Sequence, residues 1–274
     1  MTPADLSRTV LHTVRRAVED DELRVPVPER VSVRVPPRPG CGDYATNVAL
    51  QLAKGGDRPA LEIAEVLRRR LAARPGIARV DIAGPGFLNI TLDGDGASGE
   101  EIVREVFAAE YEQESLPLSP SVEDVARLGG DAARWSAVSP PGLDRSLLLV
   151  QKDSNPLFRV RYAHARARAL SRNARDLGFD SLPGAVDSSA AGPLLGALAD
   201  HARVSAARAP ERLARHLERT ADAFLRWQTG CAVLPRGDEK PLAVHRARLA
   251  LAEATGKVLA NGLTQLGITA PAHL

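Results

Sequence analysis

The sequence predicts an α+β domain followed by an all-α helical bundle. Apolar residues that alternate with polar ones, a pattern typical of strands, occur in the first third of the chain. From residue 158 onward the apolar residues recur at helical spacing instead. Between these regions, residues 115–157 contain five prolines and several glycines, which are typical of a domain boundary. We therefore predict an α+β domain over residues 1–115, a connector over 116–154 and a helical bundle over 155–274.

The predicted α+β domain begins with a helix. Residues 5–18 carry apolar side chains at the spacing that puts them on one helix face. Residues 31–35 alternate like a strand, which Pro36 ends. Asp43 then occupies the position of a helix N-cap, because short polar side chains accept hydrogen bonds from the first free backbone N–H groups. The helix that it would cap covers residues 44–54.

Further signals complete this domain. Pro59 suits the first turn of a helix that runs to about Ala73. Two short strands, over residues 77–82 and 87–92, flank a glycine–proline–glycine turn at 84–86. A capping-box pattern that starts at Ser98 predicts a last helix, which runs to about residue 114.

The rest of the chain is predicted to be helical. The connector holds one helical stretch, over residues 122–135. In the bundle, helical spacing between loops that contain glycine or proline predicts four helices. They cover residues 157–177, 192–204, 210–233 and 240–265.

Charge is distributed unevenly along the chain, which has 36 basic and 34 acidic residues and a net charge of +2. Residues 1–115 carry 15 basic and 19 acidic side chains, whereas residues 151–274 carry 18 and 11. A basic second half predicts a polyanionic partner, for which nucleic acid is the main candidate. The alternative origin of this excess is a genome whose codons favour arginine and alanine.

Several classes of protein are excluded by composition. No apolar run approaches the roughly 18 residues that a membrane helix needs, and the first 20 residues lack the pattern of a secretory signal. Cys41 and Cys231 lie far apart and form no metal or redox pair, which fits a reducing compartment. We therefore expect a cytoplasmic protein with no membrane partner.

Motifs of known enzyme classes are absent from the sequence. It has no G-x-x-x-x-G-K-[ST] phosphate loop, no G-x-G-x-x-G fingerprint and no G-x-S-x-G elbow. The six histidines are scattered, and no two of them have the spacing of zinc ligands. We therefore predict no catalytic residue, no metal site and no cofactor.

Two stretches stand out as candidate binding sites. The first pairs residues 42–50 with residues 84–89. Its glycine–proline turn lets backbone approach a ligand closely, the Phe87 ring could stack on an unpaired base, and the Asn89 amide could read the edge of that base. The alternative is an ordinary strand pair in which Phe87 lies in the core and Asn89 ends a turn.

The second stretch is an arginine-rich helix over residues 159–175, which contains six arginines and no acidic residue. Four of them lie on one side of a helical wheel, beside an apolar face that includes Tyr162. Such a stripe can neutralise phosphates. The alternative is a solvated charged face over buried alanines. The four arginines are Arg161, Arg168, Arg172 and Arg175.

At these residues the sequence resembles arginyl-tRNA synthetase. Residues 42–47 and 84–89 are similar to that family's N-terminal additional domain, and residues 155–166 are similar to the first helix of its DALR-type anticodon-binding bundle. Further similarity covers a connector and the end of the chain, at residues 130–135, 245–251, 259–263 and 266–271. The resemblance therefore covers most of the chain, in order.

The resemblance implies two groups of tRNA-binding residues. The first, expected to contact the tRNA elbow, comprises Phe87, Asn89, Gly86 and Asn47. The second, expected to contact the anticodon stem-loop, comprises Arg159, Arg161, Tyr162, His164, Arg166, Arg168 and Leu274. Arg159 and Arg161 stand where the family often has Tyr and Gln, and Leu274 stands where it ends in Met.

The family's class I catalytic domain has no counterpart in the sequence. The H-x-G-H and K-M-S-K-S motifs are both absent, and they stabilise the reacting phosphates in that family. The resemblance thus implies a catalytically empty relative that binds tRNA, specifically tRNA-Arg, and presents or sequesters it. One alternative is a protein-interaction subunit that docks on a synthetase, a tRNA-modifying enzyme or a tailoring enzyme. Another is a small independent enzyme that uses His164 or Asp43.

Overall fold

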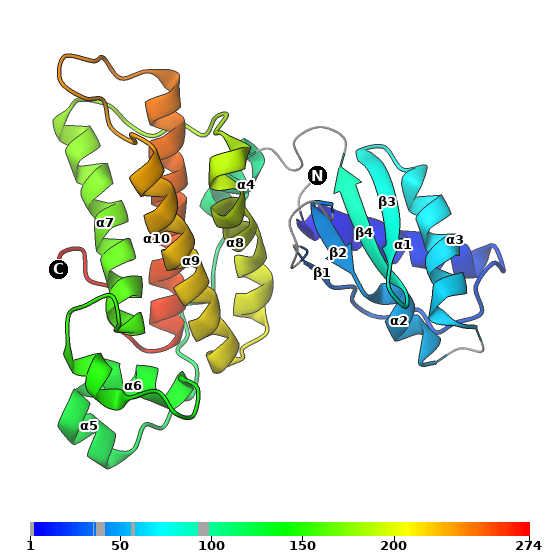
Figure 1. The fold of residues 1–274 in the computed structure, drawn as a ribbon, viewed down its shortest axis with the longest axis horizontal. Coiled ribbons are helices and arrows are strands. Elements are labelled where there is room, and N and C mark those ends of the chain that lie inside the picture. Colours follow the sequence, from blue (N-terminus) through cyan, green and yellow to red (C-terminus); the bar gives the residue numbers. More distant parts are fainter. Residues whose placement is uncertain (1–2, 35, 37–41, 56–57, 93–98) are drawn as a thin grey trace. The chain divides into compact units, whose positions relative to one another are not determined.

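The computed structural model describes residues 3–34, 36, 42–55, 58–92 and 99–274 of the chain. It forms two compact units, Met1–Ser98 and Gly99–Leu274 (Figure 1). Residue 35 of the first predicted strand, Cys41, and Ser98 of the predicted capping box lie outside the described residues. The predicted order, an α+β part followed by an all-α part, is confirmed.

The described residues of the first unit form an antiparallel sheet and three helices. The sheet has the order β1-β2-β4-β3, so β4 lies between β2 and β3. Its strands are β1 (Val33–Arg34), β2 (Tyr44–Thr46), β3 (Ile77–Ala83) and β4 (Phe87–Leu92). The helices are α1 (Pro3–Glu19), α2 (Val48–Ala53) and α3 (Ala60–Ala72).

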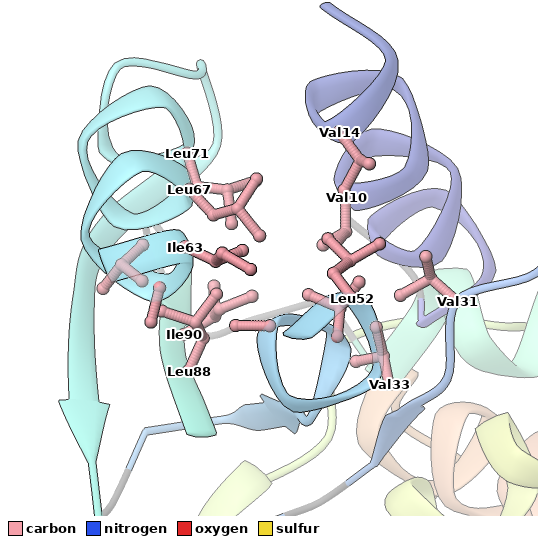
Figure 2. Packing of buried hydrophobic residues seen from close by; sticks show 14 of the residues in the cluster. Val10, Val14, Val31, Val33, Leu52, Ile63, Leu67, Leu71, Leu88 and Ile90 are labelled. Carbon is pink, nitrogen blue, oxygen red and sulfur yellow. The ribbon is translucent and has the colours of Figure 1, made fainter. Parts of the chain in front are cut away.

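The core of the first unit lies between the helices and one face of the sheet. Figure 2 shows Val10 and Val14 of α1 pointing toward Ile63 of α3, with Leu88 and Ile90 of β4 below them. All five side chains are fully buried. At about 1.5–3 kcal/mol for each fully buried aliphatic side chain, this cluster is the main stabilising element of the unit.

The prediction of a helix over residues 44–54 was wrong in its first turn. Tyr44 and Thr46 are buried in β2, where they lie opposite Ile90 and Leu88 of β4. Asp43 does not cap α2, because its carboxylate accepts a hydrogen bond from the backbone N–H of Leu92 at 2.8 Å. The pairing with β4 is non-local, so the local N-cap pattern could not indicate it.

The second unit is all-helical. Figure 1 shows its long helices running side by side, with α5 and α6 at one end. The unit comprises α4 (Gly99–Ala108), α5 (Val122–Leu128), α6 (Gly130–Val138), the 3-10 helix η1 (Arg145–Leu149), α7 (Pro156–Asp176), α8 (Ser188–Ala206), α9 (Pro210–Gly230) and α10 (Ala243–Gln265). The helix predicted over residues 122–135 is two helices, because the backbone at Gly129 takes a φ of +81° that interrupts the helix.

The second compact unit begins at Gly99, because residues 99–116 dock on α10. Lys257 donates hydrogen bonds to the backbone carbonyls of Phe107 and Ala109, at 2.9 and 2.8 Å, and so caps the end of α4. The N–H of Leu116 donates to the carbonyl of Gln265 at 2.7 Å. Side chains on a distant helix therefore decide where the second unit begins.

Within the described part of the chain, no helix combines the length and the apolar character needed to cross a membrane.

Candidate nucleic-acid interface

The first candidate surface is the outer face of β4. Successive side chains of a strand point to opposite faces, so Leu88, Ile90 and Leu92 enter the core while Phe87 and Asn89 point away from it. The Phe87 ring is 42% exposed. The alternative prediction, with Phe87 in the core and Asn89 at the end of a turn, was therefore wrong, since Asn89 lies inside the strand.

Asn89 occupies the middle of a cross-strand row on this outer face. Ala45 of β2 lies opposite it on one side, and Asp81 of β3 on the other. Asp81 forms an ion pair with Arg79, with 2.8 Å between the guanidinium nitrogen and the carboxylate oxygen. Asn89 is half-buried, with the small Ala45 opposite it and the exposed Phe87 on the same face of β4.

Gly86 and Asn47 lie at the same end of the sheet. Thr46 faces Leu88, so Asn47, which follows β2, comes level with the start of β4 at Phe87. The Asn47 side chain makes no capping hydrogen bond to α2. The structure thus brings the four residues predicted to contact the tRNA elbow to one region of the unit.

Gly86 has a structural reason to be glycine. Its φ is +134°, and an added Cβ would lie 3.1 Å from both the Cβ and the carbonyl oxygen of Ala60 at the start of α3. Both features disfavour a side chain, because L residues rarely adopt that backbone conformation and the nearest atoms, which belong to a helix, would have to move. Gly86 therefore holds the turn before Phe87 tightly against α3.

Replacing this glycine is expected to destabilise the first unit. Gly86→Ala should lower the free energy of unfolding by about 1–3 kcal/mol, the range for a strained backbone conformation. Gly84→Ala is the matched control for backbone strain alone, because Gly84 also has a positive φ, of +54°, but an added Cβ there would meet no atom within 4 Å, so this variant should lose less stability. Urea denaturation of both variants checks the prediction, which equal losses of stability would contradict.

The second candidate surface lies around α7, whose N-cap Asn155 accepts a hydrogen bond from the Phe158 N–H at 3.0 Å. The Tyr162 ring is 41% exposed and stacks on Phe158, with 5.8 Å between the ring centroids. Arg159 donates to the carbonyl of Asp153 at 2.9 Å and lies 3.2 Å from the carboxylate of Asp222 on α9. Its guanidinium is therefore held at the beginning of α7.

Side chains of α7 fasten the end of the chain to the helix. Arg161 donates to the carbonyl of Thr269 at 3.2 Å, and Arg172 donates to that of Ala272 at 3.1 Å. Between them, Nδ1 of His164 lies 2.9 Å from the carbonyl oxygen of Pro271, so this nitrogen carries the proton. Burial lowers the pKa of His164, which keeps the ring neutral.

Asp131 of α6 completes this attachment. Its carboxylate accepts hydrogen bonds from the Arg161 guanidinium and from the Thr269 hydroxyl. The arginine-rich helix was predicted from a stretch without acidic residues, but α6 and α9 supply the acids, as Asp131 and Asp222. Arg159 and Arg161 therefore act as internal partners of the fold.

Leu274 and Arg161 share a cleft of about 520 Å³ at the start of α7. Phe158 lines it as well, and the Leu274 side chain is 58% exposed. Sequence reasoning missed Phe158 as a site residue, although its spacing of four from Tyr162 predicts that the two rings meet on a helix. An apolar wall beside a guanidinium is able to hold a planar, polar-edged group such as a nucleobase.

The remaining predicted residues of α7 lie away from this cleft. Arg166 donates to the Gln228 side chain on α9 at 3.1 Å. Arg168 is exposed and lines a different pocket, between α7 and α10, together with His164 and Lys257. The structure therefore gathers Arg161, Tyr162 and Leu274 near one cleft and separates Arg166 and Arg168 from it.

Buried histidines of the second unit lie outside both candidate surfaces. His201 of α8 and His216 of α9 stack with 5.3 Å between ring centroids, and Nε2 of His201 lies 2.9 Å from the side-chain oxygen of Asn261. Burial lowers the pKa of His201 to about 4 and that of His216 to about 3. Among the described residues, no group of three or more His, Cys, Asp or Glu side chains could hold a metal ion.

Both units match known protein domains. Residues 5–92 match the family model described as arginyl tRNA synthetase N terminal domain, and residues 160–274 match the DALR anticodon binding domain. The chain therefore contains one region similar to each of these two domain models. The resemblance to arginyl-tRNA synthetases noted in the sequence is confirmed.

Curated relatives are arginine–tRNA ligases. The enzyme of Paenarthrobacter aurescens is 42% identical over 162 residues, which cover 55% of this chain and 30% of that protein. The enzyme of Frankia alni is 55% identical over 109 residues, which cover 40% of this chain and 19% of that protein. The chain thus spans less than a third of the length of these relatives. Among solved structures, the arginyl-tRNA synthetase of Thermus thermophilus matches with a TM-score of 0.41 and 27% sequence identity. The match covers 64% of this chain and 31% of that chain.

Proposed function

We propose that this protein is a catalytically empty relative of arginyl-tRNA synthetase that binds tRNA, specifically tRNA-Arg, and presents or sequesters it. One observation carries the proposal: both matched domains are present, yet only residues 93–159 lie between them. In the family, a catalytic domain of a few hundred residues occupies that interval. Here the interval contains α4, α5, α6 and η1, and α4 docks on the bundle.

The tRNA elbow would bind at the outer face of β4. An unpaired base would stack on the exposed Phe87 ring, and the neighbouring Asn89 amide would hydrogen-bond to its edge. Gly86 would act indirectly, because its close packing on Ala60 sets the position of the turn. The exposure of Phe87 on the same face as Asn89 supports this arrangement.

The anticodon loop would bind at the cleft beside Leu274. A base there would contact Leu274 and the Phe158 ring, and the Tyr162 ring would extend the stacking surface. Arg166, which is exposed beside Gln228 of α9, would attract the phosphates, whereas Arg159, paired with Asp222, would hold the start of α7 in place. Since Arg161 and His164 bind the chain end, their role in this proposal is to position Leu274.

In the proposed function, the protein does not act as a ligase. Adenylate formation by the family's mechanism needs the H-x-G-H and K-M-S-K-S motifs, and neither occurs in the sequence. The proposal also takes the protein to be cytoplasmic, which the lack of a cysteine pair in the sequence supports. An enzyme that uses or modifies tRNA would receive the bound molecule.

A binding panel tests the function directly. Purified protein would be titrated with transcribed tRNA-Arg isoacceptors and with unrelated tRNAs at about 150 mM salt, because weaker ionic strength exaggerates non-specific binding. Preferential binding of tRNA-Arg is expected. Uniform binding would contradict recognition of tRNA-Arg, and no binding would contradict the proposal as a whole.

Removal of the Phe87 ring is expected to weaken tRNA binding. Phe87→Ala should cost about 1–3 kcal/mol of binding free energy, the range for one base–aromatic stack, which is roughly 5- to 150-fold in Kd. Val27→Ala is the control, because Val27 is also an exposed apolar residue of the first unit. Fluorescence anisotropy with labelled tRNA measures both. Equal affinities of the Phe87→Ala variant and the wild type would exclude Phe87 from the interface.

One observation favours a second candidate function, a protein-interaction subunit that docks on a synthetase or a tRNA-modifying or tailoring enzyme. Apolar side chains are exposed on and near α5 and η1, among them Val122, which is 87% exposed, and Leu149. Exposed apolar groups of this kind occur at protein interfaces. Two results together would favour this function over the first: the wild-type protein binds no tRNA but associates with arginyl-tRNA synthetase, and Val122→Asp abolishes that association.

A further inference from the structure

Four exposed arginines form a row along α9, which we name the α9 row: Arg212, Arg215, Arg219 and Arg226. Successive members are three, four and seven residues apart, so they fall within about 60° on a helix of 3.6 residues per turn. At 1.5 Å per residue the row is about 21 Å long. It belongs to neither candidate surface described above.

The α9 row forms no ion pair with the acidic residues that the structure describes. Most other arginines of the second unit that the structure describes are engaged, as in the pairs Arg161–Asp131 and Arg203–Asp200. Among the residues that the structure describes, none of the four row arginines forms an ion pair, and the only hydrogen bond from their side chains joins Arg215 to the carbonyl of Glu211. Arg215 also attracts the carboxylate of Glu218 electrostatically. The charges of Arg212, Arg219 and Arg226 are therefore available to a ligand.

The acidic residues of α9 lie on the neighbouring strip of the helix. Asp222 is paired with Arg159 of α7, and burial raises the pKa of Glu218. Glu211 is exposed in the first turn of α9, where the helix dipole favours a negative charge. The row thus keeps an excess of positive charge although three acidic residues share the helix.

The chemistry of the row distinguishes between classes of ligand. No large hydrophobic side chain is exposed on α9 among the described residues, since those of the second unit lie on other segments, such as Val122, Tyr162 and Leu242. Protein interfaces are centred on buried aromatic or aliphatic anchors, and single-stranded nucleic acids need aromatic rings for stacking. A purely cationic row suits the phosphates of a double-stranded stem, because they carry charge in a regular line and present no base for stacking.

We propose that the α9 row binds the phosphate backbone of an RNA stem. The proposal depends on the proposed function only in taking RNA as the partner. The opposite side of α9 is buried in the bundle, through residues such as Leu217 and Phe224, so the row sits on a rigid element. Arginine heads held at fixed intervals contact successive phosphates without reading sequence.

The experiment uses an RNA hairpin with a long perfect stem and no tRNA sequence. Its binding to the full chain is measured between 50 and about 200 mM salt for the wild type and for Arg212→Gln/Arg219→Gln. Gln has nearly the helix propensity of Arg, so α9 should remain folded, which circular dichroism checks. Each lost phosphate contact reduces the slope of log K against log salt by about 1, so the double variant should lose about 2 from the slope and at least tenfold in affinity.

Arg236→Gln/Lys240→Gln is the matched control. It removes the same charge from exposed positions between α9 and α10, so it reports the effect of net charge alone. Unchanged hairpin affinity in the α9 variant, or an equal loss in the control, would overturn the proposal, as would failure of the wild type to bind the hairpin at 50 mM salt. Hairpin binding through the row without preference for tRNA-Arg would support it and contradict the proposed tRNA recognition.

Discussion

Lowering the pH from 7 to 5 is expected to destabilise the second unit by about 3–4 kcal/mol. The cause is the stacked pair His201 and His216, which is buried between α8 and α9. Burial in low dielectric disfavours the charged imidazolium, and for His216 the neighbouring Arg219 and Arg203 add repulsion. Both rings are therefore neutral in the folded protein at pH 5, whereas an unfolded chain would protonate them.

The sign of this effect follows from the order of the pKa values. The folded pKa of His201 is about 4 and that of His216 about 3, both below the ordinary 6.5. The unfolded state thus binds more protons, and the free energy of unfolding falls as the pH drops. Stability is complete above about pH 6.5 and is lost progressively toward pH 4 and pH 3. Each histidine contributes at most about 1.4 kcal/mol per pH unit within that window.

Urea denaturation at pH 7 and at pH 5, followed by circular dichroism, measures this loss. His216→Gln should reduce the difference between the two pH values by about half, even though the variant is itself less stable. His273→Gln, which changes an exposed histidine near the chain end, should leave the difference unchanged. A difference below about 1 kcal/mol in the wild type would show that the buried pair is protonated or hydrated in the folded state.

Phe224→Ala is expected to lower the free energy of unfolding of the second unit by about 3–5 kcal/mol. Phe224 is fully buried in α9, and its ring centroid lies 6.0 Å from that of Trp227. Removal of the ring takes away its transfer free energy and leaves a cavity, because α7, α8 and α10 all pack against α9 and close only partly around the gap.

The neighbouring residue provides the control for this substitution. Leu225 lies on the same helix but is only half-buried, so Leu225→Ala should cost clearly less. Thermal or urea unfolding of the two variants gives the comparison. The first unit has its own core, so its transition should keep its midpoint in both variants. A loss below about 1.5 kcal/mol for Phe224→Ala would mean that the bundle collapses around the missing ring.

The candidate site could be predicted only in part. Alternation along residues 87–92 correctly indicated a strand, but it left open whether Phe87 or Leu88 faces the core. Helices α1, α2 and α3 decide this by packing on the Leu88 side. The resemblance likewise drew attention to Arg161 and His164, yet both bind the backbone of the chain end about a hundred residues away. Contacts over such separations leave no local pattern.

The sequence by itself determined the class of fold and the long elements. The helices of the bundle repeat their apolar residues over several turns, so local periodicity sufficed to predict α7, α9 and α10. The four arginines of the α9 row also recur at helical spacing in the sequence. Glycine and proline residues were enough to predict the turn at residues 84–86 and the start of α3.

Only the tertiary structure decided the features that depend on partners distant in the chain. Tyr44 to Thr46 became a strand because β4 offered its backbone hydrogen bonds, and α4 joined the second unit because Lys257 caps its end. Asp131 neutralises an arginine that looked unpaired in the sequence. In each case the deciding free energy comes from burying or pairing polar groups that meet only after folding, so it cannot be read from neighbouring residues.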